Sequence, residues 1–243
     1  MYEIDFSDPD SPFLKILEYV FRSYVEDGSI EINEKPSEQI INEYKSITQE
    51  LIAGEVELRH TSDHRQHLLE RAEAEAGSGS AEIAVTLYAL WIEHTVNGNL
   101  IYGLQRKGYD LETINPLIRE LRLRTKITAL WHIAGFEPLA GEDVALIDQI
   151  SGARNAFVHY KWPGNAELAY ESAKEQLKNI VDRSRGLETV FSSRENALFW
   201  NGRKDEILNF YREDIKRHAR EVGPFVFGRA TPENSAESPP SSC

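Results

Sequence analysis

Three polar side chains in one short segment of the chain could serve phosphate chemistry. In "ISGARNAFVHYKW", Arg154 and Asn155 are adjacent, and His159 follows four residues after Asn155. An arginine keeps its charge and presents a fork of donors that fits phosphate oxygens. A histidine titrates near neutrality and can take up or deliver a proton. The segment could therefore bind and cleave a phosphate ester, or its composition could be chance on an amphipathic helix.

The segment lies within a predicted helix that includes residues 144–162. At about 100° per residue, one arc of this helix is apolar, formed by Leu146, Ile147, Ile150, Phe157 and Val158. Arg154 projects into the middle of that arc, while a separate stripe holds Asp148, Gly152, Asn155 and His159. Gly152 leaves a notch in the stripe. One interpretation is a phosphate site; the other is that Arg154 reaches the bundle end or pairs with Glu93, with His159 on the surface.

Helical periodicity dominates the whole chain, and clean strand alternation is hard to find. Four helical segments with short connections are predicted at about 80–107, 116–135, 141–162 and 165–185. Short connections favour antiparallel neighbours, so we predict an all-α fold built on an antiparallel four-helix up-and-down bundle. Additional helices are expected on both sides of the bundle, at about 11–28 and 37–74 and after residue 190.

The domain organisation follows from these segments. We expect an N-terminal helical region at 1–78, the bundle at 79–190 and a C-terminal helical extension at 191–228. Residues 229–243 are rich in Pro, Ser and Glu and have no apolar face, which is typical of a disordered tail.

Composition narrows the function classes. The 243 residues are 41% hydrophobic and 28% charged, as in soluble globular proteins, and the net charge of −13 argues against wide non-specific binding of nucleic acid. That charge leaves room for a small phosphate site and would suit a basic partner. The single cysteine, Cys243, excludes a disulfide framework or a thiolate metal site within one chain. With no signal peptide and no membrane-length apolar run, we expect a cytoplasmic protein without membrane contact.

The Arg154-Asn155-x3-His159 motif resembles that of the HEPN family (higher eukaryote and prokaryote nucleotide-binding domains). Ribonuclease members of that family carry it in the third helix of a four-helix bundle. The resemblance covers about residues 80–190, under half of the chain. It implies metal-independent, cofactor-free RNA cleavage in which the 2′-hydroxyl attacks its own phosphate, in a toxin or antiviral defence effector.

The resemblance also implies roles and partners. His159 would act as base or acid, Arg154 would hold the phosphate, and Asn155 would orient the sugar or the imidazole. A homodimer would bring two motif helices to one RNA cleft, and an antitoxin or other regulatory protein could control it. Some toxin members have a tyrosine two residues after the histidine, where a partner enzyme modifies it. Here position 161 is lysine and Tyr160 adjoins His159, so that control does not carry over.

Other polar residues have two interpretations each. Glu93 and Asn97 are four apart within an apolar stretch and, with Asp148 and Tyr160, could support the motif; the first two could equally form a solvated helix edge. The basic run Arg119, Arg122, Arg124 and Lys126 could guide an RNA backbone, or be a solvated face.

A metal site is the main rival to the motif. His60, His64 and His67 have the spacing of zinc ligands on one helix face, but the HExxH signature is absent and a solvent-facing cluster is favoured. Two further hypotheses stay open for the chain as a whole. One is a catalytically silent helical module that binds a nucleotide or a partner protein, and the other is a structural protein in which the motif is accidental.

Overall fold

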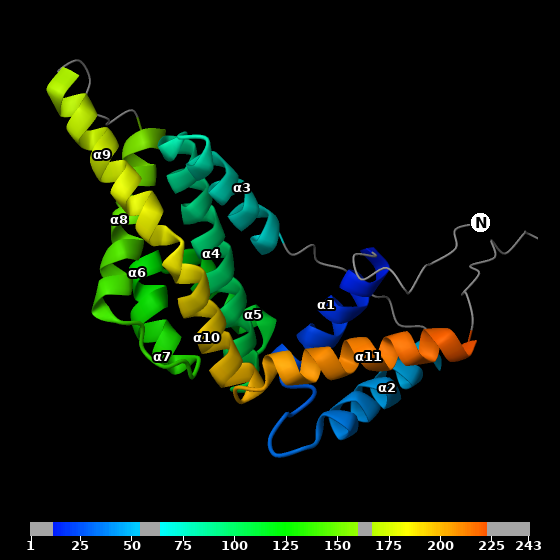
Figure 1. The fold of residues 1–243 in the computed structure, drawn as a ribbon. Coiled ribbons are helices and arrows are strands. Elements are labelled where there is room, and N and C mark those ends of the chain that lie inside the picture. The colour runs from blue at the N-terminus through cyan, green and yellow to red at the C-terminus, as the bar shows by residue number, and fades with distance from the viewer. Residues whose placement is uncertain (1–11, 54–63, 160–166, 223–243) are drawn as a thin grey trace, which may run out of the picture.

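The computed structural model describes residues 12–53, 64–159 and 167–222 (Figure 1). Within these ranges all regular structure is helical and no strand occurs, so the predicted all-α class is confirmed. In chain order the helices are α1 (Pro12–Glu26), α2 (Ser37–Ala53), α3 (Arg65–Gly77), α4 (Ala81–Gln105), α5 (Leu111–Glu120), α6 (Leu123–Thr125), the π-helix η1 (Lys126–Leu130), α7 (Trp131–Ile133), α8 (Gly141–Val158), α9 (Glu167–Ser184), α10 (Gly186–Trp200) and α11 (Lys204–Val222).

The long helix α4 is the centre of the fold. It is buried on nearly every side, by residues that include Val85, Tyr88, Ile92 and Leu100. A helix that is apolar all round must be surrounded, and α3, α5, η1, α8 and α9 all pack against it. Gly103 lets the residue that follows α7 approach α4 closely, because a Cβ there would lie 2.8 Å from the carbonyl oxygen of Ala134.

The predicted helix at 116–135 has the wrong bounds. α5 begins earlier, where the Asp110 carboxylate accepts a hydrogen bond from the Thr113 N–H (2.7 Å), and Pro116 lies inside the helix. The backbone is extended at residues 121–122 before α6, η1 and α7 follow. Helix α5 therefore continues through Pro116 and does not begin there. The proline ring removes one backbone N–H donor, and the Asp110 cap offsets that loss.

α9 and α10 form a nearly continuous rod beside α4 (yellow to orange in Figure 1). Arg185 alone separates the two helices. Phe191 of α10 packs edge-on against Trp91 of α4, with 5.7 Å between ring centroids. The rod ends at Asn201, whose left-handed backbone (φ 49°) is one that asparagine tolerates, and the chain then turns into α11.

Helices α1, α2 and α11 form a second group at the end of this rod (Figure 1). Phe21 lies fully buried at its centre, stacked on Tyr211 with 4.4 Å between centroids. Phe21 also meets Trp200, the last residue of α10, edge to face at 6.2 Å. Arg106, just after α4, donates to the carbonyl oxygen of Val25 (2.6 Å). Aromatic packing and a half-buried cation therefore attach this group to the bundle.

Packing crosses the first predicted domain boundary. α3 falls in the 1–78 region but packs along α4 as an antiparallel hairpin. The division into four regions stays a prediction, and the predicted tail at 229–243 lies outside the described residues.

Candidate functional site at the end of α8

Helix α8 carries the predicted motif and packs against α4 and α9. Glu142 and Asp143 stand in its first turn, where the helix dipole favours negative charge. Leu146, Ile147 and Ile150 are buried, as the apolar arc predicts. The first half of α8 is thereby fixed in the core, and its last turns carry the polar residues.

Asn155 connects the two ends of the motif. Arg154 lies one turn after Ile150 and is half-buried, and its Nη1 donates to Oδ1 of Asn155 (3.0 Å). His159 is exposed at the end of α8, and its backbone N–H donates to the carbonyl oxygen of Asn155 (3.1 Å). Among the described residues Arg154 is hydrogen-bonded to Asn155 and not to Glu93. The guanidinium is therefore drawn from the apolar arc toward the polar stripe that His159 ends.

The predicted stripe lies at the surface. Gly152, Asn155 and His159 are exposed, and Asp148 is half-buried. A Cβ at Gly152 would have no described atom within 4 Å, apart from the backbone of its own helix and its chain neighbours. The glycine costs about 1 kcal/mol of helix stability relative to alanine, with no packing reason among the residues that the structure describes. The notch therefore leaves space for another molecule to approach the backbone.

Two large apolar side chains adjoin the motif at the surface. Phe157 is 41% exposed and Val158 is 48% exposed. Sequence periodicity places both on the buried arc, so the second half of that arc differs from the first. Neighbouring exposed apolar residues mark a surface suited to a partner.

The predicted supporting residues Glu93 and Asn97 share a face, but that face holds Lys126. The Lys126 ammonium is buried at the start of η1 and donates to Oδ1 of Asn97 (2.9 Å). Burial lowers the pKa of Lys126, and the nearby charge of Glu93 opposes this. A solvated face is thus the wrong interpretation for Lys126, although Arg119, Arg122 and Arg124 are exposed. The one signal in the sequence was that Lys126 begins a mostly apolar run, "KITALW".

Asp148 lies at the start of the stripe and forms an ion pair with Arg124 of α6. This pair ties α8 to the segment after α5 and does not touch Arg154 or His159. The remaining predicted supporting residue, Tyr160, lies outside the described residues.

The histidine cluster is only partly described. His64 and His67 are exposed, and His60 lies outside the described residues. Over the ranges that the structure describes, no three His, Cys, Asp or Glu side chains are grouped to hold a metal ion. A zinc site that includes His60 stays a prediction.

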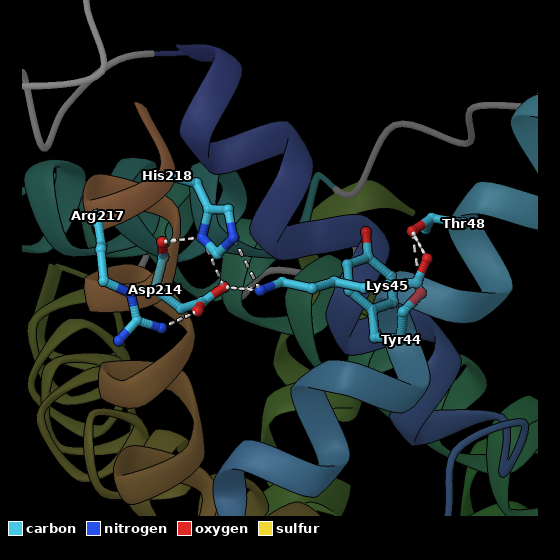
Figure 2. Close-up of polar contacts among 6 residues, drawn as sticks. All are labelled: Tyr44, Lys45, Thr48, Asp214, Arg217 and His218. Carbon is cyan, nitrogen blue, oxygen red and sulfur yellow. Dashed lines mark hydrogen bonds and ion pairs between the residues drawn. The ribbon is translucent and has the colours of Figure 1, made fainter. Parts of the chain in front are cut away.

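A second polar cluster, absent from the sequence predictions, joins α11 to α2 (Figure 2). The buried Asp214 carboxylate accepts from Lys45 Nζ (2.6 Å) and from the Arg217 guanidinium, and His218 Nδ1 lies 3.5 Å from it. Burial raises the pKa of Asp214, but the hydrogen bonds from Lys45 and Arg217 outweigh this and hold it below its ordinary value. Asp214, Arg217 and His218 have helical i, i+3 and i+4 spacing on α11, which could have indicated the local part of the cluster. The contact with Lys45 of α2 depends on how the two helices dock and has no signal in the spacing.

None of the known protein families, curated proteins and solved structures with which we compared the chain matches it. Of the helices in the described ranges, none combines the length and hydropathy that a membrane crossing requires.

Proposed function

We propose that the protein is a metal-independent endoribonuclease of HEPN type that acts as a toxin or antiviral defence effector. The observation that supports this proposal is the position of Arg154, Asn155 and His159 on the last turns of α8, where the Arg154 guanidinium bonds to Asn155 and His159 is exposed. Helices α4, α8 and α9 with the α5–α7 segment would be the four-helix bundle of that family. A phosphate at this helix end would meet a permanent cation and a titratable imidazole in one place.

The chemistry follows from these two groups. The ribose 2′-hydroxyl would attack the adjacent phosphorus, and the bond from phosphorus to the 5′ oxygen of the next nucleotide would break. One imidazole would remove the 2′-hydroxyl proton while an imidazolium delivers a proton to the departing 5′ oxygen. The Arg154 guanidinium would stabilise the negative charge that builds up on the phosphorane oxygens. The products would be a 2′,3′-cyclic phosphate and a 5′-hydroxyl.

A homodimer would complete this site, because the chain supplies one motif histidine and the reaction uses a base and an acid. Phe157 and Val158 offer exposed apolar contact area beside the motif, and the open notch at Gly152 permits close backbone approach. Both features lie on the last turns of α8. A two-fold axis near them would pair two copies of the motif.

The second candidate is a catalytically silent module that uses the same surface to bind a nucleotide or a basic partner protein. The net charge of −13 favours it, since a strongly acidic chain repels extended RNA. The two functions differ in whether RNA is cut.

Cleavage of single-stranded RNA in EDTA separates them. The wild-type protein should cut the RNA, and Arg154→Ala and His159→Ala should each lower the rate by a factor of about 100 or more. Arg71→Ala and His132→Ala are matched controls, because both residues are exposed and lie outside α8. Intact RNA with folded wild-type protein would favour the silent module. Expression toxicity that His159→Ala relieves would support the nuclease in cells.

A further inference from the structure

Three arginines lie close together in the chain where α5 ends and α6 begins. Arg119 stands in the last turn of α5, Arg122 in the extended backbone before α6, and Arg124 within α6, and all three are exposed. The side chains of Arg119 and Arg122 make no hydrogen bond or ion pair within the described ranges. These three residues are called the arginine group below.

Other arginines in the described part of the chain have acidic partners. Arg71 pairs with Glu75, and Arg194 pairs with Glu137. Acids are not scarce, since the sequence has 40 Asp and Glu against 27 Lys and Arg. The arginine group has a single acid, Glu120, within residues 117–126, and a second acid reaches it from α8. Three cations against these two acids leave an excess of positive charge, which suits an external anion.

The acid from α8 is Asp148, whose ion pair with Arg124 fixes the arginine group beside that helix. Asp148 begins the stripe that continues through Gly152 and Asn155 to His159. At about 1.5 Å per residue, this stripe is about 16 Å long. That length corresponds to roughly five nucleotides at about 3.4 Å for each stacked nucleotide. The arginine group and the motif therefore lie at opposite ends of one helix face.

The middle of that face is open. A Cβ at Gly152 would have no described atom within 4 Å, apart from the backbone of its own helix and its chain neighbours, so a strand laid on the stripe can approach the helix backbone there. The net charge of −13 repels phosphates over the surface as a whole. A strand that reaches the motif consequently needs cations along its path, and the arginine group supplies them.

We propose that the arginine group binds the phosphates of a single-stranded RNA that follows the α8 stripe to the motif. The inference rests on the proposed function and gives that function its substrate path. Arg119 and Arg122 contact phosphates that lie about five nucleotides from the phosphate at Arg154 and His159. The substrate class is single-stranded RNA of at least about five nucleotides, with little sequence preference at this end, because phosphate contacts carry no sequence information.

Fluorescence anisotropy with a labelled random pool of RNA of about eight nucleotides tests this path, in chains that carry His159→Ala so that the RNA stays intact. For a single strand, each phosphate contact contributes about 0.7 to the slope of log affinity against log salt concentration. Arg119→Ala and Arg122→Ala should therefore each lower that slope by about 0.7 and weaken binding about fivefold at about 0.1 M salt. Circular dichroism of each variant shows whether it is folded.

Lys107→Ala is the matched control. It removes an exposed cation after α4 whose side chain likewise makes no hydrogen bond or ion pair in the ranges that the structure describes. Its affinity and salt slope should equal those of His159→Ala alone. The path is overturned if the RNA pool does not bind, or if Arg119→Ala and Arg122→Ala bind as Lys107→Ala does.

Cleavage by chains with an intact motif separates this inference from the proposed function. RNA that binds through Arg119 and Arg122 but is not cut by the wild-type protein would overturn the nuclease and leave the path standing. RNA that is cut with the same kcat/KM by the wild type and by the double variant Arg119→Ala, Arg122→Ala would overturn the path and leave the nuclease standing.

Discussion

Asn155 determines the geometry of the motif at the residue scale. Its side chain accepts a hydrogen bond from the Arg154 guanidinium, and the residue itself is exposed; its backbone oxygen makes only the ordinary helix-end bond with the N–H of His159. A residue of this kind positions charged groups and contributes little to folding. Its replacement should therefore affect cleavage and spare stability.

Asn155→Ala should lower kcat/KM for RNA cleavage about 10- to 100-fold, because the guanidinium loses its anchor and misplacement of a positioned group costs factors of this size. The unfolding temperature should change little, since the lost bond is at the surface. Single-turnover cleavage and thermal unfolding of the same preparation provide the two readings. If Asn155→Ala cleaved RNA at the wild-type rate, Arg154 would not need its hydrogen bond to Asn155 for cleavage.

Sequence periodicity and motif spacing predicted which residues share α8, and that Gly152, Asn155 and His159 form one stripe; that these three are exposed came from the structure. They did not predict the partner of Lys126 or the Asp214 cluster. Hydrogen bonds such as Lys126 to Asn97 depend on how helices dock, and a pattern within one helix does not contain that information. Arg154 shows the same limit, because its position on the arc was right while its partner was a neighbour and not Glu93.

Gly152 carries the first prediction at the element scale. Gly152→Ala should stabilise the chain by about 0.5–1 kcal/mol, because alanine is the better helix former and its Cβ would meet no described side chain. The same change should lower RNA cleavage, since the added methyl fills the notch that a second chain or a substrate would approach. Chemical denaturation and cleavage rates measure the two effects. If Gly152→Ala were more stable and cleaved RNA at the wild-type rate, a second chain or substrate would not approach the α8 backbone at this position.

The docking of α11 on α2 provides a pH-dependent prediction. Because the pKa of Asp214 is lowered in the fold, its ionised form stabilises the native state above its unfolded pKa of about 3.9. That stabilisation is lost as the pH falls through the folded-state pKa. Asp214→Asn should thus lower the free energy of unfolding by about 1–3 kcal/mol at neutral pH, with a smaller difference below about pH 4.

Urea denaturation of both proteins across this pH range checks the expectation. Asp205→Asn is the matched control, because Asp205 is an exposed acid in the first turn of the same helix. If the difference in free energy of unfolding between the wild type and Asp214→Asn were the same at pH 3 as at neutral pH, ionised Asp214 would not be its source.

The elements themselves were predictable where periodicity was uninterrupted, as in α4 and α8. The region from residue 111 to 133 was not, because a proline is typical of a helix start and pointed to Pro116, whereas α5 begins after the Asp110 cap. The extended residues 121–122 divide α5 from α6, and the π-helix η1 packs against α4. That packing is a tertiary effect, which local propensity does not encode.

At the scale of the whole molecule, the proposed function requires two chains. Phe157→Glu should leave the chain folded, since the side chain is exposed, and should lower both dimer content and RNA cleavage in parallel. Light scattering on a sizing column gives the mass in solution. Ile133→Glu is the matched control, because Ile133 is an exposed apolar residue on α7. A Phe157→Glu protein that is monomeric and fully active would rule out the shared site.

The most direct measurement for the proposed chemistry is end-group analysis of RNA incubated with the wild-type protein in EDTA. Attack by the 2′-hydroxyl predicts fragments that end in 2′,3′-cyclic phosphate and begin with a 5′-hydroxyl, and no fragments with His159→Ala. Intact RNA, fragments that end in a 3′-hydroxyl, or the same fragments from His159→Ala would contradict a ribonuclease site built from Arg154 and His159.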